Sequence, residues 1–249
     1  MTGSPASVQG IPIRHFLEID STNEEARRLA LVGVEGPLWL VADLQTKGRG
    51  RRGRNWQSPE GNLAATLLLK PSMPIAQCAQ LSFVAALGAS DVVNRHVPDA
   101  EVKVKWPNDV LADEKKIAGI LLESASNDGA HSDWLAIGFG INLASHPADT
   151  EFPATSIAAL GEEPPAPRVA LDCLAASWSK WYEVWSKRGF APIRDAWLAR
   201  AARLGARIRA RIADMEAVGV FEGIDAEGAL ILREAAGRTR RISAGEVFF

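Results

Sequence analysis

The stretch from Gln45 to Gly61 constrains the fold most strongly, because it shows no hydrophobic periodicity although apolar segments flank it on both sides. Leu38–Asp43 and Leu63–Leu69 are short and apolar, which is typical of buried strands. The stretch between them is rich in glycine and arginine and has little apolar surface to bury. It therefore predicts a loop between two strands.

The remaining segments before Leu204 alternate between strand-like and helix-like patterns. Short apolar runs predict strands at Ile13–Ile19, Val102–Lys105, Val110–Ala112, Lys116–Glu123 and Trp134–Asn142. Apolar residues at helical spacing predict helices at Pro74–Asn94, Arg168–Arg188 and Ile193–Arg203. A further helix is expected from Asn23 to about Leu31, with Ser21 or Thr22 as its N-cap. On the long helix Trp178, Trp181 and Trp185 share one face, which indicates core packing rather than a ligand site.

The pattern changes after Leu204, where short strand-like runs follow one another. These runs are Ala206–Ile212, Met215–Ile224, Ala229–Glu234 and Thr239–Ile242, with a hairpin turn between the second and the third. We therefore expect a large domain over residues 13–204 and a small β-domain over residues 205–249. A flexible tail over residues 1–12 would precede them.

Composition excludes several classes of protein. Lys and Arg total 28 and Asp and Glu total 30, so the net charge is −2, unlike that of most proteins whose main task is to bind nucleic acid. Two distant cysteines are too few for a disulfide scaffold or a zinc cluster, and we expect both to be buried thiols. The chain shows neither an uninterrupted apolar span nor a secretory signal near its start. We expect a cytoplasmic protein that does not bind membranes.

The loop contains the densest functional signal, the run Lys47–Trp56. Five of its first eight residues are cationic and the other three are glycine. Glycines let a backbone approach an anion closely, and arginines donate paired hydrogen bonds to carboxylates or phosphates. Taken alone, this run is compatible with an anion-binding loop, with a solvated loop or with an RNA-binding patch. It does not match a P-loop.

Three further clusters are weaker when taken singly. Lys105–Asp109, followed by Lys115–Gly119, combines cations, an amide and a carboxylate that suit a magnesium–nucleotide, or simply form a turn with surface lysines. Gly138–Asn142 contains two strand glycines that would let a ligand lie against the backbone. Asp20–Asn23 is compatible with a plain helix cap.

Together, in order and spacing, the four clusters resemble those of the biotin protein ligases over about residues 13–145, and the small C-terminal β-domain fits as well. The resemblance implies an α+β fold: a mixed β-sheet with flanking helices, of the class II synthetase-like kind, plus a C-terminal SH3-like β-barrel. It also implies an enzyme that activates biotin with ATP to biotinyl-5′-AMP and transfers biotin to a lysine of a biotin carboxyl carrier protein.

The resemblance assigns site residues position by position. For biotin it implies Ser21, Thr22, Asn23, Gln45, Arg49, Gly50, Arg51, Lys116, Gly119 and Gly138. For ATP it implies Arg49, Arg51, Arg54, Trp56, Asn108, Asp109, Lys116 and Asn142. Lys116 and Arg51 would be the catalytic cations, and Asp109 would bind Mg²⁺.

The resemblance also sets expectations about partners. Many family members carry an N-terminal DNA-binding domain, but here the matching motif already begins at Ser21, so we expect no DNA binding. Family members are often homodimers through a sheet edge. Two alternatives stay open: a lipoate- or octanoyl-type acyl ligase or transferase of the same fold, and a non-enzymatic nucleic-acid-binding module that uses the arginine–glycine run.

Overall fold

A computed structural model describes residues 6–71, 73–126, 129–213 and 215–249. Its larger part is one eight-stranded sheet. In spatial order the strands are β1 (Ser7–Val8), β2 (Ile11–Ile19), β3 (Leu38–Gln45), β4 (Leu63–Leu69), β8 (Trp134–Ile141), β7 (Lys115–Ala125), β6 (Asp109–Ala112) and β5 (Val102–Lys105). Strands β2 and β3 are parallel and the other neighbours are antiparallel, so the predicted mixed sheet is confirmed.

The chain enters the sheet earlier than its sequence indicated. Ser7 pairs with Pro12 and Val8 with Ile11, so the described part of the expected tail already contains strand. Residues 1–5 of that tail lie outside the described residues. The difference arises because a two-residue strand is held by its backbone pairing, which a side-chain pattern does not reveal.

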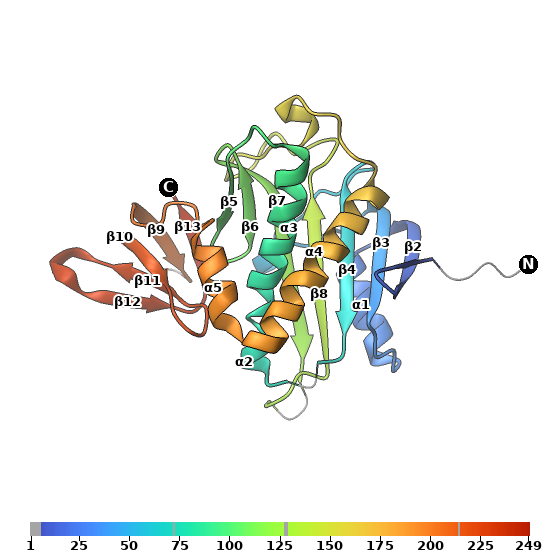
Figure 1. Cartoon of the computed structure of the whole chain (residues 1–249), viewed down its shortest axis with the longest axis horizontal. Coiled ribbons are helices and arrows are strands. Elements are labelled where there is room, and N and C mark those ends of the chain that lie inside the picture. Colours follow the sequence, from blue (N-terminus) through green and yellow to red (C-terminus); the bar gives the residue numbers. More distant parts are fainter. Residues whose placement is uncertain (1–5, 72, 127–128, 214) are drawn as a thin grey trace, which may run out of the picture.

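Helices cover the two faces of the sheet unequally (Figure 1). Helices α3 (Leu81–His96) and α4 (Pro167–Arg188) pack side by side across one face, whereas α1 (Thr22–Leu31) lies on the other. Phe139 of β8 contacts the ring of Trp178, and Trp178 and Trp185 are buried while Trp181 is half-buried. The expected tryptophan core is thus confirmed. Because α1 is short, it leaves part of the second face uncovered.

Two helix predictions were wrong in their bounds. The helix expected from Pro74 to Asn94 is two helices, α2 (Ile75–Cys78) and α3, because hydrogen bonds three residues apart, such as Ser82 N to Ala79 O, tighten the chain between them. Helix α5 (Phe190–Leu198) starts three residues earlier than expected, because Gly189 at φ +71° both ends α4 and begins α5. Three short 3₁₀ helices are η1 (Arg51–Gly53), η2 (Ala158–Leu160) and η3 (Ala235–Gly237).

The stretch Ile75–His96 is the one part of the described chain that is long and apolar enough to span a membrane, and most of it is buried inside the protein. Of the two free cysteines, Cys78 is buried as expected. Cys173 is only half-buried on α4, at the edge of the core.

The last part of the chain forms a separate antiparallel sheet of five strands, at the left in Figure 1. Its order is β12 (Thr239–Ile242), β11 (Leu230–Arg233), β10 (Met215–Ile224), β9 (Arg207–Ile212) and β13 (Glu246–Phe248). It packs on the larger part through Trp106, whose indole donates to Gly228 O at 3.0 Å, and through the rings of Trp197 and Phe221. The sequence had not indicated β13, which is three residues long.

Candidate functional site

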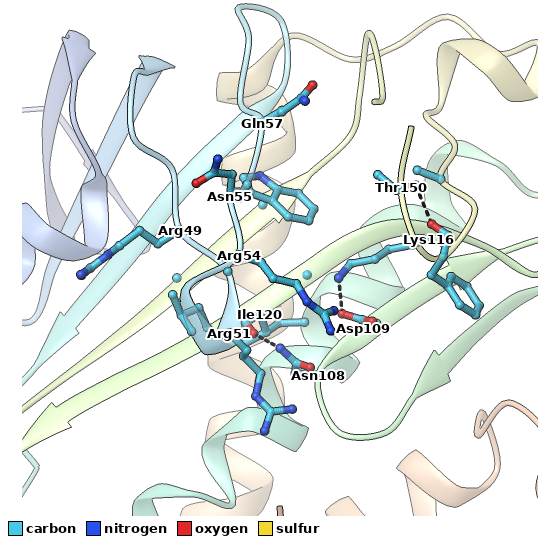
Figure 2. Close-up of a pocket in the computed structure, with 18 of the residues that line it drawn as sticks. Arg49, Arg51, Arg54, Asn55, Gln57, Asn108, Asp109, Lys116, Ile120 and Thr150 are labelled. Carbon is cyan, nitrogen blue, oxygen red and sulfur yellow. Dashed lines mark hydrogen bonds and ion pairs between the residues drawn. The ribbon is translucent and has the colours of Figure 1, made fainter. Parts of the chain in front are cut away.

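A cavity of about 390 Å³ lies between the uncovered face of the large sheet and the small C-terminal sheet. Every position that the sequence nominated for biotin or ATP lines it. Figure 2 labels Arg49, Arg51, Arg54, Asn108, Asp109 and Lys116 among them. These positions are Ser21, Thr22, Asn23, Gln45, Arg49, Gly50, Arg51, Arg54, Trp56, Asn108, Asp109, Lys116, Gly119, Gly138 and Asn142. The fold therefore brings together residues that lie more than a hundred positions apart in the chain.

Glycines form the floor of the cavity, but the protein's own side chains occupy the space above them. A Cβ on Gly138 would lie 2.2 Å from Oδ1 of Asn23. A Cβ on Gly140 would lie 2.3 Å from Cε2 of Trp56, and one on Gly119 would lie 3.1 Å from Cζ3 of the same indole. These glycines therefore seat Asn23 and Trp56 against the sheet, which is a different use from the direct ligand contact that the sequence suggested.

The Asn23 amide is fixed on both sides. Its Oδ1 accepts a hydrogen bond from the hydroxyl of Thr66 at 2.6 Å, and its Nδ2 donates to Glu123 Oε2 at 2.8 Å. Asn23 and Thr66 are buried, so this amide cannot rotate without leaving polar groups unpaired. Sequence reasoning missed Thr66, which appears there only as one polar residue in an apolar strand.

The first turn of α1 and the end of β3 are tied together beside Asn23. Gln45 Oε1 accepts from the backbone N of Thr22 at 2.8 Å and from its hydroxyl at 3.1 Å. Ser21 is the N-cap, and its side chain accepts from the backbone N of Glu24. Polar groups with fixed orientations therefore line this end of the cavity, at the partly positive end of a helix.

A lysine–aspartate–lysine cluster forms the opposite, charged part. Asp109 Oδ1 lies 2.6 Å from Lys116 Nζ, and its Oδ2 lies 3.4 Å from Lys105 Nζ. Strand register explains half of the cluster, because Lys105 pairs with Asp109 across β5 and β6. Lys116 pairs with Leu111, two residues along β6, so its side chain reaches Asp109 diagonally across β6 and β7. Figure 2 shows Lys116 and Asp109 pointing toward each other.

Burial and charge compete in this cluster. Burial opposes ionisation of Asp109, but the ammonium groups of Lys116 and Lys105 outweigh it and hold the pKa of the carboxyl below its usual value. Burial lowers the pKa of Lys105, although Asp109 partly offsets this effect. Lys105 is almost fully enclosed, with its ammonium 3.7 Å from the centre of the Phe152 ring. Lys116 is the more accessible of the two cations.

Two asparagines line the same part of the cavity. The Asn108 amide donates to Ile120 O, which fixes its orientation. The Asn142 amide donates to Thr155 O at 3.0 Å, but its buried Oδ1 has no hydrogen-bond partner among the described residues. A buried acceptor without a partner is costly unless a ligand or water satisfies it. The unpaired Oδ1 of Asn142 is therefore a candidate acceptor for an N–H or O–H donor of a ligand in this part of the cavity.

The arginine-rich loop closes on itself like a hairpin. Gly50 N donates to Arg54 O at 2.7 Å, and Trp56 N donates to Gly48 O at 2.9 Å. Gly48 is required for this approach, because a Cβ there would lie 2.3 Å from Trp56 O. The loop prediction is confirmed, but one of its glycines serves the loop's own backbone rather than an anion.

The loop arginines point in different directions. Arg49 extends away from Lys116 and Asp109 (Figure 2) and pairs with Glu24 at 3.0 Å and Glu123 at 3.2 Å. Arg51 is half-buried, and burial lowers the pKa of its guanidinium. The ring of Trp56 lies 5.4 Å from Lys116 Nζ, on the cavity floor.

One wall of the cavity was not foreseen. It consists of residues from the segment 147–154 and from β13, namely Pro147, Asp149, Thr150, Glu151, Phe152, Ala154, Glu246, Val247 and Phe248. The first segment is irregular, and the second belongs to the small C-terminal sheet. Neither carries a recognisable motif, so only the docking of the two parts of the fold reveals them.

The described residues do not form a ready metal site. No group of three or more His, Cys, Asp or Glu side chains lies together in the described part of the chain. Asp109, the residue nominated for Mg²⁺, faces an ammonium group with each oxygen. A divalent cation would have to displace one of these lysines, so the geometry here does not fit a resident magnesium ion.

Comparison with known sequences and structures agrees with this geometry. The sequence profile described as "Biotin/lipoate A/B protein ligase family" matches residues 17–142, and "Biotin protein ligase C terminal domain" matches residues 204–249. The chain therefore belongs to the biotin/lipoate A/B protein ligase family. Within that family, the match to the C-terminal domain and the relatives below place it among the biotin protein ligases.

Two curated relatives and one solved structure illustrate the similarity. The biotin–[acetyl-CoA-carboxylase] ligase of Paracoccus denitrificans is 50% identical over 236 residues, covering 92% of this chain and 97% of the relative. The bifunctional ligase/repressor BirA of Bacillus subtilis is 33% identical, covering 97% of this chain and 75% of the relative. The structure of the biotin protein ligase from Aquifex aeolicus in complex with biotin and ATP superposes with a TM-score of 0.80 at 29% identity, covering 95% of this chain and 97% of that one.

Proposed function

We propose that this enzyme activates biotin with ATP to biotinyl-5′-AMP and then transfers biotin to a specific lysine of a biotin carboxyl carrier protein. One observation carries the proposal: a single cavity combines a fixed amide and hydroxyl network at one end with a lysine–aspartate–lysine cluster and arginines at the other. A ligand with a neutral polar head and a carboxylate tail, next to a nucleotide, matches that division.

We assign biotin to the polar end. Asn23, Thr22 and Gln45 offer amide and hydroxyl groups whose orientations are already set by the network described above. Such preorganised groups suit a cyclic urea, which has both N–H donors and a carbonyl acceptor. Ser21, Arg49, Gly50, Gly119 and Gly138 complete the proposed biotin-binding set.

We assign the nucleotide to the charged end. The free acceptor of Asn142 suits an amino group such as that of adenine, and the Trp56 indole offers a flat apolar surface for a base. Asn108, Asp109 and Arg54 line the same region. Mg²⁺ belongs with ATP as part of the substrate.

The chemistry follows from charge. An oxygen of the biotin carboxylate attacks the α-phosphorus of ATP and pyrophosphate leaves; a lysine amine of the acceptor then attacks the acyl carbon, loses a proton, and AMP leaves. Both partners in the first step are anions, so they repel each other. Lys116 and Arg51 would lie between them and stabilise the charge that develops during transfer. Asp109 holds the Lys116 ammonium in place through an ion pair of 2.6 Å.

The direct test is ATP-dependent incorporation of labelled biotin into a purified biotin carboxyl carrier domain. Lipoate and octanoate are tested in parallel, with an acceptor whose target lysine is replaced by arginine as the control. The proposal requires transfer of biotin that depends on ATP and on that lysine. Transfer of lipoate or octanoate instead would favour the acyl ligase or transferase alternative.

Three partner assignments are part of the same proposal. We propose that the chain does not bind DNA in a sequence-specific way, since its net charge is −2 and two arginines of its basic loop, Arg49 and Arg54, are paired with acids. We propose a homodimer through a sheet edge, which sedimentation with and without biotin would test. We also propose the cytoplasm as its compartment, consistent with two free thiols.

A further inference from the structure

The carboxylate of Glu246 lies at the junction of the two sheets and lines the cavity. Strand β13 pairs with β9, which places Glu246 opposite Arg211, while the next residue, Val247, is buried in the small C-terminal sheet. Gly245 allows the close approach, because a Cβ there would lie 2.7 Å from Arg211 O. The Glu246 side chain is only 13% exposed, so the strand holds this carboxylate firmly.

Three arginines surround that carboxylate. Glu246 Oε2 contacts Arg54 Nη2 directly and lies 3.9 Å from Nη1 of both Arg52 and Arg211. The preceding carbonyl, Gly245 O, accepts a hydrogen bond from Arg51 Nη1 at 3.1 Å. Glu246 and the residue just before β13, Gly245, therefore contact three arginines of the loop.

The loop needs such a partner for a physical reason. The run Lys47–Trp56 carries five cations and no acid, so its compact shape requires anions from elsewhere. Glu246 supplies one of them at the cavity wall, and the more exposed Glu151, with its Oε2 3.3 Å from Arg54 Nη2, supplies a second. A guanidinium pairs with a carboxylate and with a phosphate through the same donors, so Glu246 occupies a place that a phosphate oxygen would take at Arg54.

We propose that Glu246 is a positioning residue that holds Arg54 at the cavity wall as an internal counter-anion, and that the phosphates of ATP take Arg54 from it. This inference rests on the proposed function, because it assumes that a nucleotide phosphate enters the cavity. The exchange has two consequences. ATP binding is weakened by the contact that must be broken, and Glu246 takes Arg54 back when pyrophosphate leaves.

The test uses the full chain with biotin at saturation and the α,β-methylene analogue of ATP, which cannot release pyrophosphate. Glu246→Gln keeps the shape of the side chain and removes its charge. We expect its dissociation constant for the analogue, measured by calorimetry, to fall about three- to tenfold, a range set by the modest energy of partly exposed ion pairs. Pyrophosphate should inhibit this variant at correspondingly lower concentrations.

Glu234→Gln is the matched control. Glu234 lies in the same C-terminal sheet domain, is 12% exposed and pairs with two arginines, Arg238 and Arg240, but does not line the cavity. Its dissociation constant for the analogue should equal that of the wild type. Thermal unfolding of each variant verifies that it is folded.

The double variant Arg54→Gln, Glu246→Gln separates positioning from a general effect of charge. If Glu246 acts through Arg54, the gain in affinity for the ATP analogue that Glu246→Gln produces disappears when Arg54 is already replaced by Gln. A gain that persists, or a Glu246→Gln variant that binds the analogue no more tightly than the wild type, overturns the inference. A wild-type protein that binds no nucleotide contradicts the proposed function itself, which is a separate result.

Discussion

Gly138→Ala tests whether the glycine floor seats Asn23 for biotin binding. The added Cβ would lie 2.2 Å from Asn23 Oδ1 and 3.0 Å from its Cγ, so the amide must move. Asn23 cannot move while keeping both its bond from the Thr66 hydroxyl and its bond to the Glu123 carboxylate. Alanine in a strand is otherwise no less favourable than glycine, so any loss reflects the displaced amide.

The size of the effect follows from those two hydrogen bonds. A neutral hydrogen bond contributes about 0.5–1.5 kcal/mol and one to a charged group about 1.5–3 kcal/mol. Thr66 and Glu123 retain Thr22 and Arg49 as partners, so we expect the free energy of unfolding to fall by about 1–3 kcal/mol. With the amide displaced, the dissociation constant for biotin should rise about 10- to 100-fold.

Calorimetric titration with biotin and denaturant unfolding measure the two quantities. Ala136→Gly is the matched control, because Ala136 lies on the same face of β8 under α1 and does not line the cavity. It should lose about 1 kcal/mol of stability and bind biotin like the wild type. A Gly138→Ala protein with wild-type stability and wild-type affinity for biotin would refute this account of Asn23.

The remaining predictions concern charge. Lys116→Ala should remain folded by circular dichroism but release pyrophosphate about 10²–10⁴ times more slowly, and a variant that keeps more than half of the wild-type rate would contradict its role. The hydrogen bond from Arg28 lowers the pKa of Asp20 from 3.8 to about 2, so the stability from this pair is fully present above about pH 4 and is lost as the pH falls through 2. NMR of the Asp20 carboxyl carbon should show a titration midpoint near pH 2, and Arg28→Gln should move this midpoint back toward 3.8. A midpoint that Arg28→Gln leaves unchanged would show that Arg28 does not lower the pKa of Asp20. The chain should give no sequence-dependent DNA band shift at physiological salt, and a shift that follows DNA sequence would contradict the expected absence of DNA binding.

Local signals in the sequence were sufficient for most of the fold. The runs at Leu63–Leu69 and Val102–Lys105 predicted β4 and β5 with their observed bounds, because each is a short apolar or alternating segment with clear ends. The break between α2 and α3 could not be predicted, since the apolar spacing continues across it and the difference lies in backbone hydrogen bonds. The start of α5 was missed because one glycine serves both as the end of a helix and as the start of the next.

The residues of the cavity likewise divide into those that local sequence patterns identify and those that only the folded structure reveals. The nominated residues lie in compact motifs, so a linear pattern could identify them and the fold brings them together. Thr66 was missed because it acts through a neighbour, by fixing the Asn23 amide. Gly140 was identified, but for ligand contact rather than for seating Trp56. Glu246 was missed because its role depends on the docking of the C-terminal sheet against a loop nearly two hundred residues earlier, which no local pattern encodes.

Strand β8 has an evolutionary consequence, because all of its residues are buried and both of its faces are in use. On one face Phe139 packs against the aromatic rings of Trp39 and Trp178, and on the other Gly138 and Gly140 seat Asn23 and Trp56. A strand at the protein surface tolerates substitutions on its solvent-facing side, whereas β8 has no solvent-facing side. A larger side chain at Phe139 or its odd-numbered neighbours disturbs the core, and one at Gly138 or Gly140 displaces Asn23 or Trp56, so almost no position of this strand is free to vary neutrally.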